Sequence, residues 1–154
     1  MFLNGLQNLA VVEELREFIR DEFDHQRNRF RKHIGLSLEE RIERFICFAG
    51  LEFKEIDQHG RAGFRHSGND SRLREGDLVR LSRNGSTDEW QRASIYREED
   101  GEIWLASESH FSVSHFERMG FDDWILDEDF LDLEGFYLDA LSRVETTTIG
   151  QERI

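Results

Sequence analysis

The spacing of apolar residues changes along this 154-residue chain, and the change constrains the fold more than any other feature. Through residues 12–49 apolar residues recur every three or four positions, which is the period of an amphipathic helix. From Leu51 they alternate with polar residues, which is the period of a half-buried β-strand. A helical pattern returns after residue 132. The sequence therefore predicts an α+β fold with helices at both ends and strands between them.

The first predicted helix runs from about Val12 to His33. Leu15, Ile19 and Phe23 continue its apolar face. A helix of this length is a rod of roughly 35–40 Å, since each residue rises 1.5 Å. Its far end is basic, and cations are favoured there by the helix dipole, although the same residues could contact phosphates. The basic residues are Arg27, Arg29, Arg31 and Lys32.

A second helix is predicted after Gly35. Ser37 and Glu40 have the spacing of a capping box, and Gly50 is a typical residue for a left-handed helix stop. Two helices joined by a short glycine-containing turn predict an antiparallel helical hairpin, or stalk, over residues 1–50. The apolar stripe of the second helix comprises Ile42, Phe45, Ile46 and Ala49.

Five short strands with glycine-containing turns between them follow, which predicts a small antiparallel β-barrel over residues 51–120. The predicted strands are 51–55, 61–66, 78–83, 90–98 and 102–107, and the turns include Asn84–Asp88 and Asp100–Gly101. Residues 121–145 then hold a strand and a helix that returns to the stalk, and 146–154 form a weakly patterned tail. The helix face comprises Leu133, Tyr137, Ala140, Leu141 and Val144.

Charge is unevenly distributed, although the formal net charge is −13. Residues 1–77 carry a net charge of −2 and residues 78–154 carry −11. Within this pattern, Arg61–Arg97 holds eight arginines against five acids. A uniformly acidic chain would argue against nucleic acid as a partner, but this chain has a basic stretch beside an acidic half.

Several classes of function are not supported by any motif. The sequence has no P-loop, no HExxH and no GxSxG, so we predict neither a catalyst nor a bound cofactor. The histidines lack metal-ligand spacing, and His110 and His115 are predicted to be ordinary loop or surface residues. The single Cys47 is predicted to be a buried apolar residue and favours a reducing, cytoplasmic location. The longest uncharged run, Met1–Val12, is too short to span a membrane.

The basic stretch is interleaved with aromatic residues. Guanidinium groups match phosphate geometry and aromatic faces stack on bases, so the combination predicts contact with a single-stranded nucleic acid. The alternative is that these arginines are solvated strand residues that pair with the acidic half. The candidate binding residues are Arg61, Arg65, Arg72, Arg74, Arg80, Arg83, Trp90 and Tyr96, with Phe64, Arg92 and Trp104 in the same stretch.

The order of these segments resembles the region before the ATPase core of superfamily 1 helicases of the Upf and senataxin type. Those chains carry a long stalk helix, an S-L-E-E-R helix and a barrel insertion with a G-D-x-V-x-L strand, followed by a tryptophan-containing strand and an amphipathic helix. The matching segments here are Leu36–Arg41, Leu51–Phe53, Gly60–Arg65, Leu73–Leu81, Trp124–Leu126 and Leu133–Val144.

The resemblance implies that the stalk helices hold the barrel against a motor core, and that the barrel lies over a bound single strand. The nucleotide-binding core that follows in that family is missing from this sequence. The chain would then be either an excised accessory region, which the weakly patterned tail favours, or a stand-alone relative without motor activity.

Two hypotheses follow. In the first, the chain is an accessory stalk and barrel that contacts single-stranded DNA or RNA without sequence preference and couples it to an ATPase core elsewhere. In the second, it is an acidic protein-interaction or regulatory module that uses its helical hairpin or the acids of Asp122–Asp139 and binds no nucleic acid. Neither hypothesis includes a membrane partner.

Overall fold

The computed structural model describes residues 2–84 and 89–152. The chain divides into two compact units, which are Met1–Arg31 with Leu131–Ile154, and Lys32–Phe130. In sequence, therefore, the second unit is inserted between the two parts of the first. The predicted α+β class is confirmed, with a long N-terminal helix, an antiparallel sheet and a C-terminal helix.

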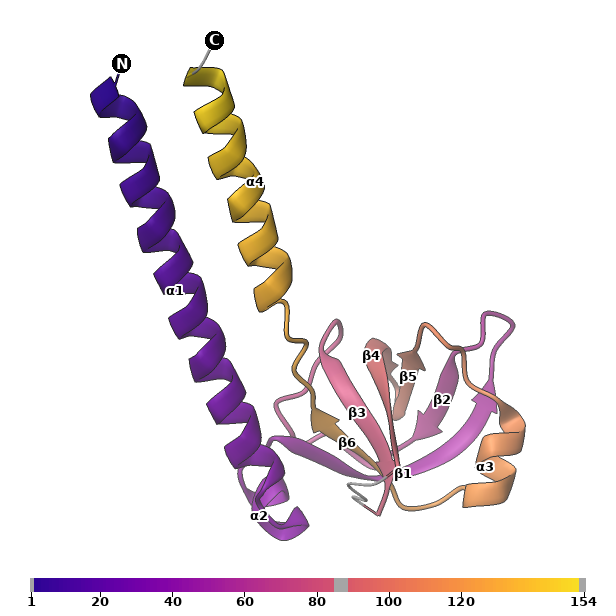
Figure 1. Ribbon diagram of the computed structural model, residues 1–154. Coiled ribbons are helices and arrows are strands. Elements are labelled where there is room, and N and C mark those ends of the chain that lie inside the picture. The colour runs from indigo at the N-terminus through magenta and orange to yellow at the C-terminus, as the bar shows by residue number, and fades with distance from the viewer. Residues whose placement is uncertain (1, 85–88, 153–154) are drawn as a thin grey trace. The chain divides into compact units, whose positions relative to one another are not determined.

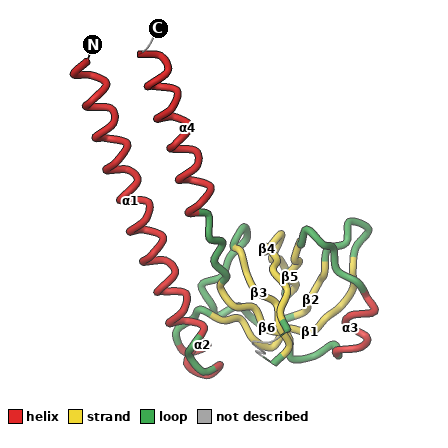
Figure 2. The backbone as a smooth tube through the Cα atoms, in the orientation of Figure 1, coloured by secondary structure: helices red, strands yellow, loops and turns green. Residues whose placement is uncertain are grey.

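The first unit is an antiparallel pair of helices (Figure 2). Helix α1 covers Phe2–Ile34 and helix α4 covers Glu134–Glu152. Arg16 is 2.6 Å from Glu145 and Arg27 is 2.8 Å from Asp132, so α4 runs back along α1 as predicted.

Helix α4 extends through most of the segment that the sequence predicted to be a tail. The tail prediction for 146–152 is therefore wrong, and residues 153–154 lie outside the described residues. The Thr146 hydroxyl donates a hydrogen bond to the Ser142 carbonyl one turn earlier, at 2.9 Å. This bond satisfies the Thr146 hydroxyl within the helix.

The second unit is a closed barrel of six antiparallel strands in the described part of the chain (Figure 1). The strand order round the barrel is β1-β2-β5-β4-β3-β6. The strands are β1 (Cys47–Ile56), β2 (Ala62–Arg65), β3 (Leu78–Arg83), β4 (Trp90–Glu99), β5 (Glu102–Ala106) and β6 (Trp124–Glu128). The five predicted strands are present, and the strand predicted to follow the barrel is its sixth member, since it pairs with both β1 and β3.

Alternation along the strands fills the barrel interior. In β1, Leu51 and Phe53 are buried while Glu52 is exposed, as the period of two predicted. The β4–β5 turn is formed by Asp100 and Gly101 with φ of 52° and 77°, the left-handed values that a tight hairpin requires. Of the turn predicted over 84–88, only Asn84 belongs to the described residues, because 85–88 lie outside them.

The predicted second helix is mostly wrong. Helix α2 covers only Leu38–Glu43, where the Ser37 side chain caps Glu40 as expected, and Phe45 then turns the chain with φ of 63°. Cys47 pairs with Asp127 of the neighbouring strand β6, so the strand ladder with β6 overrides the local helical pattern. Gly50 does have positive φ, but it lies at an irregularity of β1 and ends no helix.

Helix α3 (Val113–Met119) was not predicted and covers one end of the barrel. Its Phe116 is fully buried and stacks on Phe53 with ring centroids 3.9 Å apart. A seven-residue helix offers too few turns for a recognisable apolar period, so the sequence showed only a loop. This side chain, rather than the helix as a whole, closes the barrel core.

A buried ion pair joins α2 to the barrel. Arg41 Nη1 lies 2.7 Å from Asp127 Oδ1, and both side chains are almost fully buried. Cys47 is buried beside this pair as predicted. Burial and the nearby Asp127 carboxylate raise the pKa of the Cys47 thiol far above its usual range, so it is an unreactive thiol at neutral pH.

In the part of the chain that the structure describes, none of the helices is long and apolar enough to cross a membrane.

Candidate nucleic-acid interface

Basic and aromatic side chains gather on the outside of four neighbouring strands. On β4, Ala93 and Ile95 are buried, so Trp90, Arg92 and Tyr96 share the opposite, outer face. The adjacent strands β3, β5 and β2 add further members through the register of the sheet. We define the outer wall as Arg61, Arg65, Arg80, Trp90, Arg92, Tyr96 and Trp104.

One end of the outer wall is a stack fixed by a carboxylate. The Arg80 guanidinium lies over the Trp90 ring, 3.8 Å from its centroid. Asp129 accepts hydrogen bonds from Arg80 Nε at 2.9 Å and from Arg92 Nε at 2.5 Å, and its side chain is fully buried. Burial alone would raise the pKa of Asp129, but the hydrogen bonds from Arg92 and Arg80 outweigh it and lower that pKa.

We expect Asp129 to make the barrel sensitive to acid. A lowered folded-state pKa gives stability that is present above the unfolded pKa and is lost as pH falls through the folded value. Asp129→Asn should therefore cost about 1.5–3 kcal/mol at neutral pH, and this cost should shrink below about pH 4, the range of an ordinary aspartate. Urea unfolding of both proteins from pH 3 to pH 7 measures the difference, and a cost that does not change with pH would contradict the assignment.

A second stack lies further along β4. The Arg61 guanidinium is 4.0 Å from the centroid of the Tyr96 ring, and Tyr96 is 53% exposed. Asp57 lies 2.7 Å from Arg61 Nε and also accepts hydrogen bonds from the backbone N–H groups of His59 and Arg61. Tyr96 is six residues from Trp90, which is about 20 Å along a strand.

Beside the second stack the outer wall is closely packed. A Cβ at Gly63 would lie 2.8 Å from the Trp104 ring, so the indole fits against this strand only because residue 63 is glycine. Trp104 is 8% exposed and therefore contributes packing rather than an open stacking face. Arg65 is exposed at the end of β2, where its charge helps to lower the pKa of Glu102, although the hydrogen bond from Lys54 is the main cause.

The structure brings five of the eight sequence-predicted residues to this wall and leaves three elsewhere. Arg72 and Arg74 lie in the β2–β3 loop, where Arg72 is 3.0 Å from Glu128. Arg74 Nη1 donates to the carbonyls of Ser71 and Leu73 and so braces the loop. Arg83 lies at the end of β3, and Phe64 is fully buried in the core.

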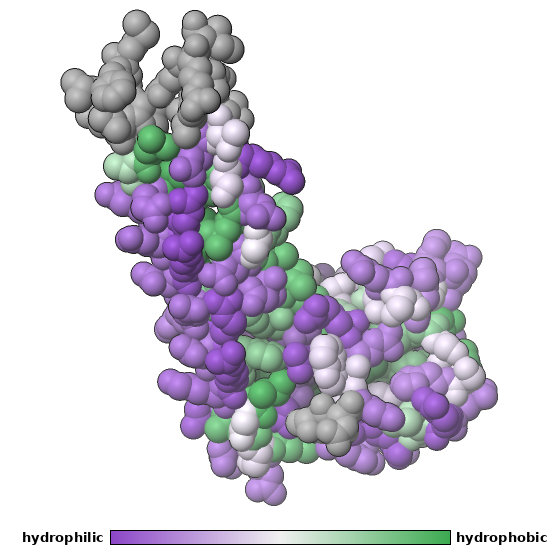
Figure 3. All heavy atoms as spheres, in the orientation of Figure 1, coloured by the Kyte–Doolittle hydropathy of each residue, from purple (hydrophilic) through white to green (hydrophobic). Residues whose placement is uncertain are grey.

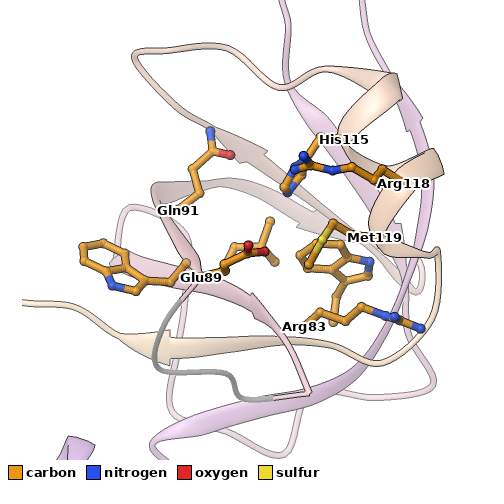
Figure 4. Close-up of a pocket in the computed structure, with 9 residues that line it drawn as sticks. Arg83, Glu89, Gln91, His115, Arg118 and Met119 are labelled. Atoms are coloured by element: carbon orange, nitrogen blue, oxygen red, sulfur yellow. The ribbon is translucent and has the colours of Figure 1, made fainter.

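Arg83 borders a cavity of about 410 Å³ at the barrel end beside α3 (Figure 4). Residues of β3, β4 and β6, with Glu89 just before β4, form one side, and three residues of α3 form the other. The lining residues are Leu81, Arg83, Glu89, Trp90, Gln91, His115, Arg118, Met119 and Trp124. We call this space the mouth cavity.

The sequence missed several residues of both surfaces. Arg92 shares the parity of Trp90 on β4, so alternation could have added it to the candidate set. His115 and Arg118 reach the mouth cavity only because α3 folds over the barrel, and no sequence signal indicated that helix. His110 is an exposed loop residue, as predicted.

Among the described residues, no group of three or more histidine, cysteine, aspartate or glutamate side chains could hold a metal ion. Comparisons of the chain with protein-family models, with curated proteins and with solved structures gave no match.

Proposed function

We propose that this chain is the accessory stalk and barrel of a helicase-like protein, which contacts single-stranded DNA or RNA without sequence preference and couples it to an ATPase core that this sequence lacks. The observation that carries the proposal is the outer wall, where two guanidinium groups stack on two exposed aromatic rings of one strand. Arginine supplies phosphate contacts and aromatic faces supply base stacking, which together are the means of sequence-tolerant strand binding.

The ion pairs of the acidic residues support strand binding over the alternative of an acidic protein-interaction module. Asp127 is buried against Arg41 of α2, and Asp129 is buried against two arginines of the barrel. Asp132 and Glu134 both pair with Arg27. These carboxylates already have cationic partners within the chain, so less of the acidic half is presented to a basic partner. The single, buried cysteine supports the cytoplasmic location that we propose with this function.

The coupling surface that we propose lies on the helix pair. Val11, Leu15 and Phe18 of α1 are exposed, and so are Phe136 and Val144 of α4. On each helix these residues are rotated by about a third of a turn, about the helix axis, from the residues that contact the other helix. The rotation has the same sense on both helices when each is viewed from its own N-terminus. In an antiparallel pair such positions fall on the same side of the pair. Figure 3 shows hydrophobic residues along the helix pair, interspersed with hydrophilic ones. An apolar face of this kind suits a motor core or another protein partner.

Fluorescence anisotropy with a labelled 15-nucleotide strand, titrated across salt, tests the strand-binding proposal. We expect the logarithm of the binding constant to fall linearly with the logarithm of the salt concentration. The double variant Arg61→Gln/Arg65→Gln should reduce this slope by roughly 1.4, because each phosphate contact of a single strand contributes about 0.7.

The matched control is Arg20→Gln/Arg44→Gln, which removes the same charge from exposed positions outside the outer wall. It should leave the slope nearly unchanged. Equal losses in the two double variants would mean that total charge, not the wall, determines binding. Absence of binding by the unaltered chain at low salt would contradict the proposed function.

A further inference from the structure

Two arginines of the outer wall share one carboxylate. Arg80 of β3 and Arg92 of β4 are partners in the antiparallel register, so these like charges lie on directly opposite residues, an arrangement that is unfavourable by itself. Asp129 accepts a hydrogen bond from the Nε of each arginine, and its side chain is fully buried while theirs are partly exposed. The three side chains together therefore carry a single positive charge, although the two arginines alone would carry two.

The backbone also holds this carboxylate in place. The Asp129 N–H donates to the Leu78 carbonyl at 3.0 Å, and the Phe130 N–H donates to Asp129 Oδ1 at 2.7 Å. Arg92 Nη2 donates in turn to the Phe130 carbonyl at 3.3 Å. Because these bonds fix both the main chain and the side chain of Asp129, we expect the carboxylate to stay beside the two arginines when a ligand approaches them.

Asp129 is ionised at neutral pH. Burial acts to raise the pKa of Asp129, but the hydrogen bonds from Arg92 and Arg80 lower that pKa below its ordinary value. Water and salt screen a buried charge less than an exposed one, so the field of this carboxylate reaches the surface that the two arginines present. At the second stack the Asp57 side chain is 25% exposed, and solvent screens it more. The first stack is therefore the part of the outer wall where a carboxylate most reduces the attraction for phosphate.

We infer that Asp129 is an internal restraint on strand binding, which cancels one of the two positive charges that Arg80 and Arg92 offer to phosphate. The restraint acts on the strand-binding surface of the proposed function and so rests on that function. A strand that a motor core drives past the barrel must leave each contact again, so the contacts need to be weak. Asp129 limits the attraction for phosphate while it keeps the Arg80 guanidinium in place over the Trp90 ring.

Asp129→Asn tests the restraint, because it removes the charge and keeps the shape of the side chain and one oxygen acceptor. Anisotropy of the full chain with the labelled 15-nucleotide strand should show a salt slope that is steeper by about 0.7, the contribution of one further phosphate contact. Between 1 M and 50 mM salt this change in slope corresponds to about eightfold tighter binding. A variant that only loosened the outer wall would bind the strand more weakly, so the direction of the change distinguishes a restraint from structural damage.

The matched control is Asp21→Asn, which removes the same charge from an exposed position on α1. It should leave the salt slope unchanged, and an equal gain in this control would overturn the restraint in favour of an effect of total charge.

A double variant keeps the test decisive if Asp129→Asn alone does not fold. Arg92→Gln/Asp129→Asn has the net charge of the unaltered chain and leaves no buried carboxylate without its cation at this stack. The restraint predicts the unaltered salt slope for this double variant, because one positive charge remains at the stack. A slope lower by about 0.7, as expected from the loss of Arg92 alone, would overturn the restraint.

The possible results separate the restraint from the proposed function. If the unaltered chain binds the strand, and folded Asp129→Asn binds it with the same slope or more weakly, the restraint is overturned and the proposed function stands. If only Asp129→Asn binds at low salt, the restraint is supported and the proposed function is contradicted for the unaltered chain. If neither protein binds the strand, both are overturned. Circular dichroism of each variant shows whether the barrel is folded under the conditions of the titration.

Discussion

Replacing Phe116 with alanine is expected to lower the free energy of unfolding of the barrel by about 3–5 kcal/mol. The ring is fully buried, and it contacts Phe53, Phe64 and Trp124 with centroid separations of 3.9, 5.7 and 4.9 Å. Removing it would leave a cavity at the end of the core, which the rigid strands cannot collapse to fill. Urea unfolding followed by tryptophan fluorescence measures this loss, since all three tryptophans are in the barrel.

The control is Val113→Ala on the same helix, where the side chain is 46% exposed and the change should stay within about 0.5 kcal/mol. Both variants place an alanine in α3, and alanine is compatible with a helix. The difference between their free energies of unfolding therefore reports the contribution of the buried Phe116 ring. If Phe116→Ala proved as stable as Val113→Ala, the Phe116 ring would not close the core in the way that the structure describes.

The second large effect is expected at the ion pair of Arg41 and Asp127. Asp127→Ala should cost about 3–5 kcal/mol, because it leaves the Arg41 guanidinium buried without its partner. Burial raises the pKa of Asp127, against the opposing effect of Arg41, so the environment does not favour an isolated charge. The same urea titration measures the loss, with circular dichroism to show that the barrel is still folded in water.

A double replacement distinguishes the lost partner from lost packing. Arg41→Met/Asp127→Leu removes both charges and keeps apolar volume, so it should be close to the unaltered chain in stability. If the double variant were as unstable as Asp127→Ala, the damage would come from packing near α2 rather than from an uncompensated charge.

Local patterns were sufficient for most of the fold. The first helix, the five strands and the Asp100–Gly101 turn each depend on residues within a few positions of one another, so period and turn chemistry predicted them. The second helix failed for the opposite reason. Residues 47–49 continue a helical period, yet Cys47 pairs with Asp127, which is 80 positions away in the sequence. Short-range period cannot report a partner at that distance.

The candidate site likewise combines features that local patterns predict with features that depend on contacts distant in sequence. Alternation on β4 predicts that Trp90 and Tyr96 share a face, and the structure has them both on the outer wall. The sequence could not tell which arginines have carboxylate partners. Arg80 and Arg92 meet at Asp129, and Arg72 meets Glu128, through contacts that only the closed barrel creates. The choice between solvated and paired arginines therefore depends on long-range geometry.

Closure by β6 has a consequence for the order of events during synthesis. Strand β6 begins only at Trp124, yet it pairs with β1, which begins at Cys47. Contacts so distant in sequence form slowly, because the intervening loop must first be ordered. A nascent chain that ends near residue 120 would leave the edges of β1 and β3 without a neighbour, and unpaired edges are templates for aggregation. The barrel therefore exposes unpaired strand edges until β6, a short strand made late in synthesis, pairs with β1 and β3.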